Sequence, residues 1–396
     1  MQAVFKRDDL AYVLKTITSL FSTLSIGRFG APITFKFRKG RCLVECKHAG
    51  ASFGAKIDNA GEDTGEFTIQ HGLIRKFAFP GAAVSFVVKK RGILCSSGAF
   101  SGMLNSETVS EDEYVEDISD LEVHEIDAGA LVQCLQSVAF KVASTSPIGV
   151  RIISTGLHVE AHSNDDFKGA FCRVPFKGEP YELVMPRVLS DILGESIDPG
   201  SGLTKIGSSP LCVYVENSMF KVVYPTMQIA SIANVTEYIA PFEAKSAMLD
   251  VTAAYGDLAD GLQQITAAFR DDAKLTKQIS LSLSRAKDAT DGVTKQGAKN
   301  SKKERGGLAL QLKVTTPVGA VRYAVAVKVN RKPQKGDVFM CPDFLREFVA
   351  MAGGRGLGMP TKTLREQPVH LLVTDTVTVL SGEGGRFKGA FHNQVN

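Results

Sequence analysis

The sequence lacks the features that mark a secreted or membrane protein. No apolar run approaches the ~18 residues that a membrane span requires, and the N-terminus MQAVFKRDD reaches charged residues before any hydrophobic stretch long enough for a signal peptide. Cysteine is sparse, with seven residues in 396, and all are single apart from Cys42 and Cys46, whose spacing in a strand predicts two buried thiols on one face. Tryptophan is absent as well, which excludes nothing. We therefore expect a cytoplasmic protein.

The sequence also lacks the motifs of the common enzyme classes. None of the seven histidines lies in a nucleophile elbow, an HExxH helix or a Cys/His zinc signature. The glycine-rich stretch Gly353–Gly358 follows a predicted helix instead of opening one. A second stretch, Gly382–Gly389, lacks the Lys-Ser/Thr ending of a P-loop and predicts a hairpin turn. We expect no catalysis, no metal and no cofactor.

Two pairs of polar residues have simple structural explanations. His158 and His162 fall on one face of a predicted strand, but no carboxylate lies at metal-ligand spacing, so we expect solvated strand histidines. Asp165 and Asp166 are adjacent, and adjacent strand residues point to opposite faces. This pair therefore predicts a turn and not a pair of catalytic carboxylates.

What the sequence does contain is a pattern that recurs three times: an amphipathic helix, short strands, a second short helix and further strands. Apolar residues at three- and four-residue spacing predict the helices, and alternation with period two predicts the strands. The predicted helices are Asp8–Phe21 and Leu73–Ala78, Ala128–Val142 and Arg187–Leu193, and finally one within Ala254–Arg270 and Phe344–Ala352.

The length of the chain fits this repetition. A chain of 396 residues exceeds what one hydrophobic core usually serves, whereas ~130 residues is an ordinary domain size. We predict an α+β protein of three repeated domains, at residues 1–118, 119–242 and 243–396, each with two helices backed by antiparallel sheets. Pro241 and its neighbours predict the second boundary.

Charge is unevenly distributed along the chain, although the net charge is only +4. Glu107–Glu125 is densely acidic and predicts a solvated connector between domains. Arg285–Arg305 is Lys-rich and nearly free of large apolar residues, which predicts a mobile insertion in the third domain, near residues 285–306. Two explanations of this insertion stay open: solubility, or sequence-independent contact with nucleic-acid phosphates.

Segments at both ends of the chain carry a resemblance to a known family. The opening KRDDLAYVLKTITSLFSTLSIGRFGAPITFKF gives a helix, a loop with an arginine and the start of a strand. Near the other end, GDVFMCPDFLREFVAMAG gives a strand and a helix, and VHLLVTDTVTVL gives closing strands. These segments, and the chain over essentially its whole length, resemble the bacterial-type DNA polymerase sliding clamps (the β-clamp family). The Lys-rich insertion, the net positive charge and the C-terminus FHNQVN depart from that family and fit a divergent clamp, for example one from a virus or mobile element.

The resemblance implies a fold and a function. Two head-to-tail subunits of three clamp-type domains would form a homodimeric ring around duplex DNA, with the helices on the inner wall and the sheets outside. Such a ring tethers the replicative DNA polymerase and confers processivity without being an enzyme. The polymerase and the clamp loader would dock short peptides between the second and third domains. The protein would be cytoplasmic, either with the nucleoid or, if viral, in the host.

A ring that slides should contact the DNA backbone alone, because contacts with base edges would create sequence-dependent stopping points. Lys and Arg on or beside the predicted helices are the candidates for these contacts. Each one taken alone is explained equally well by a solvated helix face. The candidates are Lys15, Arg28, Arg75, Lys76, Lys141, Arg187, Arg270, Lys274 and Arg346.

Ring closure and partner docking predict two further sets of residues. Open sheet edges need partners, and pairing the first domain of one chain with the third domain of another satisfies both edges. The candidates for this interface are Phe100, Met103 and Leu104 on one side and Phe269 and Leu275 on the other. The family's peptide pocket, carried over where the match allows, gives Ile148, Phe167 and Phe391.

Two other classes of protein stay open at this stage. A repetitive β-rich structural or interaction protein without a DNA-encircling ring would show the same internal repeats. A nuclease would need clustered metal-binding carboxylates, and none cluster convincingly in the sequence.

Overall fold

The computed structural model describes most of the chain. The described residues are 1–21, 24, 31–74, 77, 79–106, 118–140, 149–226, 234–243, 247–267, 278–285, 308–316, 319–334, 336–354 and 361–393. The chain forms two compact units. The first consists of Met1–Val132, Ser154–Gly156 and Phe176–Ile229, and the second of Gln133–Ile153, Leu157–Pro175 and Ala230–Asn396. The division into three domains stays a prediction.

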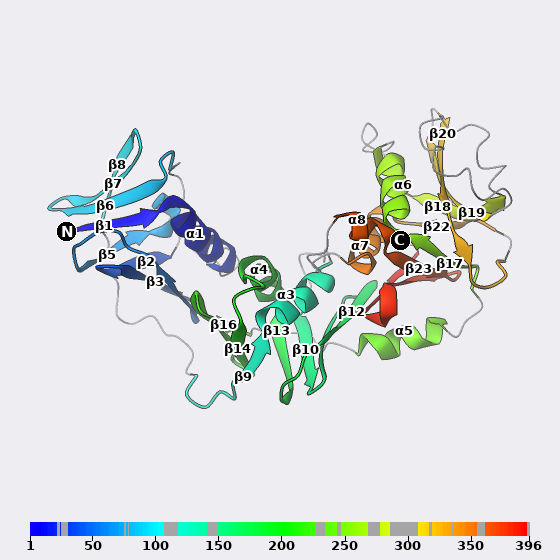
Figure 1. Ribbon diagram of the computed structural model, residues 1–396, viewed down its shortest axis with the longest axis horizontal. Helices are drawn as coiled ribbons and strands as arrows, with labels where there is room; N and C mark the ends of the chain where they lie inside the picture. The colour runs from blue at the N-terminus through cyan, green and yellow to red at the C-terminus, as the bar shows by residue number, and fades with distance from the viewer. Residues whose placement is uncertain are drawn as a thin grey trace. The chain divides into compact units, whose positions relative to one another are not determined.

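The order of elements repeats along the chain (Figure 1). A strand, a helix and three more strands follow one another six times in the described residues, with a second helix, α8 (Thr361–Glu366), in the last copy. The copies begin at β1 (Gln2–Lys6), β5 (Gly65–Gln70), β9 (His124–Asp127), β13 (Pro180–Pro186), β17 (Leu249–Ala254) and β22 (Val338–Met340). Each of the three copies recognised in the sequence therefore contains this motif twice. The prediction missed the finer period because the opening strands are short and run directly into their helices.

The first unit contains helices α1 and α4, a short α2 and two sheets. The helices are α1 (Arg7–Phe21), α2 (His71–Ile74) and α4 (Arg187–Ser196). The strands are β1 (Gln2–Lys6), β2 (Pro32–Arg38), β3 (Arg41–His48), β4 (Ala51–Ile57), β5 (Gly65–Gln70), β6 (Ala83–Lys89), β7 (Gly92–Ser97), β8 (Phe100–Leu104), β9 (His124–Asp127), β13 (Pro180–Pro186), β14 (Leu203–Ser208), β15 (Cys212–Glu216) and β16 (Phe220–Pro225). The sheet orders are β1-β6-β7-β8 and β5-β2-β3-β4-β16-β15-β14-β9.

The second unit also combines helices with two sheets. Its helices are α3 (Ala128–Ser137, which begins in the first unit), α5 (Val235–Glu243), α6 (Tyr255–Ala267), α7 (Pro342–Ala352) and α8 (Thr361–Glu366). Its strands are β10 (Gly149–Thr155), β11 (His158–Asn164), β12 (Lys168–Pro175), β17 (Leu249–Ala254), β18 (Ile279–Arg285), β19 (Leu308–Thr316), β20 (Gly319–Ala326), β21 (Lys328–Val329), β22 (Val338–Met340), β23 (Pro368–Val373), β24 (Val377–Ser381) and β25 (Phe387–His392). The sheet orders are β10-β11-β12-β25-β24-β23-β17-β21 and β20-β19-β18-β22.

Neighbouring strands pair antiparallel in both units, as between β1 and β6, β2 and β3, β12 and β25, and β18 and β19. The predicted α+β class with antiparallel sheets is confirmed. Amphipathic periodicity accounts for α1, which buries Leu10, Val13 and Ile17 against the sheets and leaves Lys15 in solvent. Inward-facing phenylalanines fill the core beneath it, with the rings of Phe35 and Phe67 stacked 4.8 Å apart.

Strand β25 divides the long sheet of the second unit into two faces by simple alternation. Phe387, Gly389 and Phe391 point toward α7, where Phe348 contacts all three positions. Lys388 and His392 point the other way, toward α5, where they bond Glu243 and Tyr238. We call these the α7 face and the α5 face of the sheet.

Several predicted elements need correction. The helix predicted over Ala128–Val142 ends at Ser137, and Phe140 beyond it is buried, with its ring 5.9 Å from that of Phe348. The segment around Pro241 is not merely a boundary turn but the helix α5. Asn234 begins this helix by accepting a hydrogen bond from the Thr236 N–H, and the missing N–H of Pro241 limits its length.

Local predictions for the glycine and aspartate turns are confirmed. Gly384 and Gly385 have φ of 65° and 69° in the hairpin between β24 and β25, a conformation that favours glycine. Asp165 lies in the turn between β11 and β12, where its carboxylate accepts the N–H groups of Phe167 and Lys168. Cys42 and Cys46 are both buried on one face of β3, as expected.

Candidate functional site

Helices α1 and α4 lie side by side in the first unit (Figure 1). The Tyr12 hydroxyl of α1 donates a hydrogen bond to the carbonyl of Ser196 at the end of α4. One turn along, Lys15 Nζ lies 3.3 Å from Glu195 Oε2, and both side chains are about 70 % exposed. The predicted DNA contact Lys15 is therefore an accessible cation on a helix pair, with one exposed acid as its neighbour.

Arg187, the second described DNA candidate, is in a different environment. Its side chain is only 9 % exposed, and its Nε donates to Asp191 Oδ1 at 2.8 Å, one turn along α4. Burial raises the pKa of Asp191, while the adjacent guanidinium lowers it less. A DNA phosphate would have to compete with Asp191 for this arginine.

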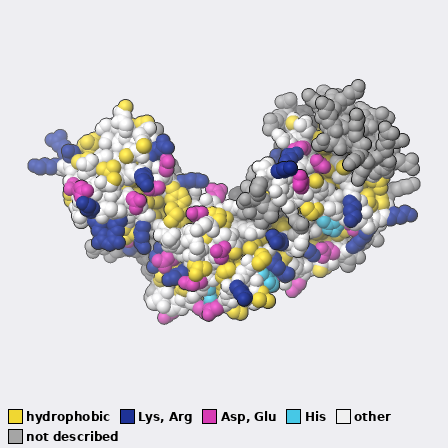
Figure 2. Space-filling view, in the orientation of Figure 1, with side chains coloured by type: hydrophobic (Ala, Val, Ile, Leu, Met, Phe, Trp, Pro, Cys, Tyr) yellow, Lys and Arg dark blue, Asp and Glu magenta, His cyan; other side chains and the backbone are white. Residues whose placement is uncertain are grey.

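Arg346 on α7 resembles Lys15. It is 56 % exposed and lies 3.2 Å from Asp343 on the preceding turn. Figure 2 shows the same interspersion of Lys and Arg with Asp and Glu across the visible surface. The other predicted DNA contacts lie outside the described residues; they are Arg28, Arg75, Lys76, Lys141, Arg270 and Lys274.

An aromatic patch is present on the α5 face of the second unit. It consists of Phe167, Tyr238, Phe242 and His392, and we call it the α5 patch. Phe167 is 45 % exposed, and its ring packs edge-on against that of His392 with the ring centroids 6.4 Å apart. The ring centroids of Tyr238 and Phe242 are 5.6 Å apart. The Tyr238 hydroxyl and His392 Nε2 are 3.1 Å apart, which fixes two of the rings relative to each other.

The α5 patch rests on a small apolar cluster. Val235 and Ile239 of α5 pack with Leu372, Val379 and Ala390 of the sheet, and Tyr238 and Phe242 are partly buried against this cluster. A Cβ added to Gly169 would lie 3.2 Å from Val235, so glycine lets α5 approach β12 closely. Burial raises the pKa of Tyr238, which keeps its hydroxyl neutral as a hydrogen-bond group. The surface is apolar with polar tips, a character suited to holding a short peptide.

The predicted pocket residues fall in three different places. Phe167 belongs to the α5 patch. Phe391 is fully buried on the α7 face against Phe344 and Phe348, so its ring is not accessible from the α5 side. Ile148 lies outside the described residues. Sequence reasoning missed Tyr238, Phe242 and His392, although the alternation of β25 already puts His392 on the face opposite Phe391.

Open sheet edges are present in both units. In the first unit β8 is an edge strand. Its Met103 is 53 % exposed, and the ring of its Phe100 packs on that of Phe77 with the ring centroids 5.0 Å apart. Leu104 is only 3 % exposed and belongs to the core of its own unit. In the second unit the edges β20 and β22 expose Val321 and Phe339. The predicted interface residues Phe269 and Leu275 lie outside the described residues.

His162 of β11 is not solvated, contrary to the prediction, whereas the His158 side chain is 26 % exposed. His162 is only 1 % exposed, and its Nε2 lies 3.3 Å from the Glu160 carboxylate, which also binds His158 and Arg173. Burial raises the pKa of Glu160, but the hydrogen bond and charge of Arg173 outweigh it and lower the pKa overall. Arg173 lies opposite Glu160 on the neighbouring strand β12, and sequence spacing within β11 cannot reveal this partner. Within the described residues, no group of three or more His, Cys, Asp or Glu is arranged to hold a metal.

Among the helices of the described residues, none is both long and apolar enough to cross a bilayer.

Comparison with solved structures identifies the fold. The DNA polymerase III beta subunit from Thermotoga maritima superposes with a TM-score of 0.74 at 11 % identity, covering 100 % of this chain and 99 % of that one. The DNA polymerase sliding clamp from Bacillus subtilis superposes with a TM-score of 0.72 at 12 % identity, covering 100 % of this chain and 99 % of that one. The DNA polymerase III subunit beta from Pseudomonas aeruginosa superposes with a TM-score of 0.71 at 12 % identity, and both chains are fully covered.

These similarities define a class of architecture. The chain has the DNA polymerase sliding-clamp fold along its whole length, with a sequence that has diverged to 11–12 % identity. No family model matches the sequence, and no curated protein matches it. The fold predicted from the family resemblance is therefore confirmed by structure where sequence comparison finds nothing.

Proposed function

We propose that this protein is a DNA sliding clamp, a ring that encircles duplex DNA and tethers a replicative polymerase without being an enzyme. The observation that carries the proposal is the full-length match in fold to polymerase clamps, together with the sixfold β-α-β-β-β repetition. Such a match extends to every element of the chain, whereas a generic β-rich repeat protein would share only parts of it.

Ring closure would use the open sheet edges. Strand β8 of one chain would pair with an edge of the β20-β19-β18-β22 sheet of a second chain, so that unpaired N–H and C=O groups on both edges are satisfied. Applied head to tail, this contact closes a homodimer. Exposed Met103 on β8 is the described side chain best placed to be buried in it.

DNA would be held through its phosphates. Exposed Lys15 and Arg346 each have an acidic neighbour, an arrangement that supports weak and sequence-independent contact. The remaining predicted cations would add to this contact from segments beside the helices. The protein would work wherever this DNA is replicated, either at a bacterial nucleoid or on viral DNA in host cytoplasm.

The polymerase and the clamp loader would dock through short peptides with apolar anchors. The α5 patch supports this assignment, because it presents a half-exposed phenylalanine beside two hydrogen-bonded rings. In this proposal Phe167, Tyr238 and His392 contact the peptide, and Phe391 supports the sheet from behind.

A plasmid-retention experiment tests the clamp proposal directly. The protein, loaded onto nicked circular plasmid with its loader, should stay bound through gel filtration and be lost after the plasmid is linearised. Replacing Arg28 and Lys76 by alanine should reduce both the retention of the protein on the plasmid and the salt dependence of its DNA binding. Replacing Lys302 and Lys303 should have a smaller effect, because only Arg28 and Lys76 are predicted at the inner wall. Equal retention on circular and linear DNA would exclude sliding.

Oligomeric state tests ring closure separately. Met103→Asp should weaken the dimer at least ~10-fold in light scattering, because a carboxylate would be buried without a partner. Leu211→Asp is the matched control, since Leu211 is 63 % exposed on the same unit but lies outside β8. A parent protein that is a stable monomer would favour the alternative, a β-rich interaction protein without a ring. Cleavage of DNA that depends on a divalent metal would instead indicate a nuclease.

A further inference from the structure

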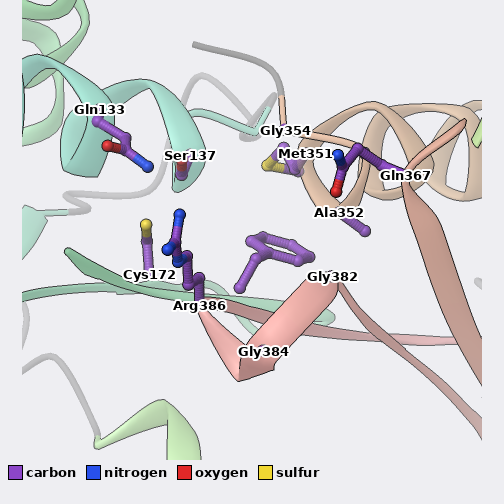
Figure 3. Close-up of a pocket in the computed structure, with 12 residues that line it drawn as sticks. Gln133, Ser137, Cys172, Met351, Ala352, Gly354, Gln367, Gly382, Gly384 and Arg386 are labelled. Atoms are coloured by element: carbon purple, nitrogen blue, oxygen red, sulfur yellow. The ribbon is translucent and has the colours of Figure 1, made fainter. Parts of the chain in front are cut away.

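A cavity of about 430 Å³ lies on the α7 face of the second unit (Figure 3), and no residue of the α5 patch lines it. The end of α3, the end of α7 and strands β12 and β25 surround it. Its lining residues are Gln133, Ser137, Cys172, Met351, Ala352, Gly353, Gly354, Gln367, Gly382, Gly384, Arg386 and Phe387. Gly384 and Arg386 are exposed, so the cavity communicates with solvent, and its volume is that of a small-molecule site.

Cys172 lies in this cavity next to polar groups. Alternation on β12 turns Lys168, Ala170 and Cys172 toward the α7 side, and Figure 3 shows the Cys172 thiol directed at the same space as Ser137 and Arg386. A second cysteine, Cys134 of α3, stands behind it and is fully buried. The feature is thus a thiol with a thiol, a hydroxyl and a guanidinium around it, at the wall of a solvent-connected cavity.

These neighbours favour the thiolate. Hydrogen bonds from Cys134 and Ser137 and the charge of Arg386 lower the pKa of Cys172, although burial raises it. Two other buried thiols behave in the opposite way: burial raises the pKa of Cys42 and of Cys95 to about 12. The thiolate is the reactive form of cysteine, so among these three thiols reactivity should concentrate at Cys172, which is only 2 % exposed and is reached through the cavity that it lines.

The cavity also has a preference for charge. Arg386 is the one charged side chain among its described lining residues, and it has no carboxylate partner in the described part of the chain. Arginine binds carboxylates in a two-pronged geometry, and the amides of Gln133 and Gln367 can add further hydrogen bonds. A small organic molecule with a carboxylate matches this lining better than a neutral one.

We propose that Cys172 is a covalent modification site for small acidic disulfides, which enter the cavity with a carboxylate bound to Arg386. The Cys172 thiolate attacks one sulfur of the disulfide. The S–S bond of that molecule breaks as the new bond to Cys172 forms, and the departing thiolate takes a proton from solvent. The small disulfide is the oxidant, and no other reactant is needed. The product is a mixed disulfide whose acidic part occupies the cavity between α3 and α7.

Two thiol reagents of different charge test the proposal. Full-length protein is treated with the dianionic dithiobis-nitrobenzoate or the neutral dithiodipyridine, and the rate at each cysteine is followed by peptide mass spectrometry. Cys172 should react first with the anionic reagent, ahead of Cys341, the half-exposed thiol outside the cavity. Cys172→Ser should abolish that fast phase.

The Arg386 variants decide the role of charge. Arg386→Gln should lower the ratio of anionic to neutral rates at Cys172 roughly tenfold, the effect of about 1.4 kcal/mol from one charged contact. Arg386→Lys should restore most of this ratio, and Arg322→Gln, which removes an exposed arginine outside the lining, should leave it unchanged. The ratio cancels any change in thiol pKa, which affects both reagents. An unchanged ratio in Arg386→Gln, or earlier modification of Cys341, would overturn the proposal.

Discussion

The α7 face and the α5 face of one sheet in the second unit differ in how completely they are covered. On the α7 face, the ring centroid of Phe348 lies 6.4 Å from that of Phe387 and 5.3 Å from that of Phe391, and all three rings are buried. On the α5 face, the sheet contributes residues such as Ala390 and Val379, and the aromatic rings of α5 stay partly exposed. One face of a sheet can thus contribute packing to stability, while the opposite face keeps side chains accessible for binding.

One lysine on the α7 face is enclosed as well. Lys168 is only 5 % exposed, and its Nζ lies 4.3 Å from the centre of the Phe344 ring and 3.5 Å from Glu347. A buried ammonium is tolerated when aromatic faces and a carboxylate surround it. This face therefore has little left to offer a partner protein.

The α5 face ends in a polar network instead. Asp250 on β17 is 2 % exposed and accepts hydrogen bonds from Asn330 at 2.9 Å and from Arg331 at 2.9 Å, and its Oδ1 lies 2.8 Å from His370 Nε2. Asp250 faces Leu372 across the strand pair, so this network begins where the apolar cluster under α5 ends.

The largest effect should come from the α7 face. Phe348→Ala should reduce the free energy of unfolding by about 3–5 kcal/mol, because it opens a cavity among Phe344, Phe387 and Phe391. Phe242→Ala on the α5 face should cost clearly less, since that ring is only partly buried. Urea unfolding of both variants measures the difference. Equal losses would mean that the two faces contribute alike and would break the comparison.

The polar network should show an intermediate effect that depends on pH. Burial raises the pKa of Asp250, but hydrogen bonds from His370 and Asn330 and the charge of Arg331 outweigh it and hold the pKa below its ordinary 3.8. A carboxyl with a depressed pKa stabilises the fold above its ordinary pKa, and this stabilisation is lost as the pH falls through the folded value.

Asp250→Asn should therefore cost about 1–3 kcal/mol at pH 7, because a buried acceptor of charged hydrogen bonds is lost. The cost should begin to shrink below about pH 4, where the unfolded carboxyl takes up a proton, and should be smallest below the depressed pKa, where the folded parent is protonated too. Urea titrations at both pH values measure it. A cost that stays constant with pH would show that the network acts through shape and not through charge.

Peptide binding should separate the two faces without a large change in stability. Tyr238→Ala should weaken a short, apolar-anchored peptide from the cognate polymerase about tenfold, or about 1.4 kcal/mol, because the variant removes the ring that holds His392. Tyr238→Phe should lose less. Phe391→Leu, on the opposite face, should leave the affinity within about twofold. Calorimetry on folded, dimeric variants measures the peptide affinity. If Phe391→Leu weakened binding and Tyr238→Ala did not, the peptide would bind on the α7 face and not at the α5 patch.

Much of the fold was predictable because local patterns determine it. The helix over Asp8–Phe21 and the turns at Asp165 and Gly384 follow from periodicity and from the backbone conformations that their residues favour. The opening strands were missed because elements such as β9 have four residues and depend on neighbours far away in the sequence, here β14. Their pairing is a tertiary property that no local window contains.

The candidate site was predicted less well, and strand parity explains why. Phe391 was carried over from the family's pocket, but its ring lies on the α7 face, and a shift of one residue moves a side chain to the other face. Arg187 was chosen because it begins a helix, yet Asp191 binds it one turn later. Buried ion pairs of this kind depend on how the helix is oriented against its sheet, which the charge pattern alone does not specify.

The smallest effect should come from the ion pair that links α5 to β25. Lys388 Nζ lies 2.8 Å and 3.1 Å from the two oxygens of Glu243, with side chains 32 % and 40 % exposed. Because water screens half-exposed charges, a double-mutant cycle with Lys388→Met and Glu243→Gln should give a coupling energy of only about 0.2–1 kcal/mol. In 1 M salt, where screening acts over about 3 Å, the coupling should fall toward zero. A coupling above about 2 kcal/mol that resists salt would mean that charge fastens α5 to the sheet, instead of the packing of Val235 and Ile239 on the apolar cluster.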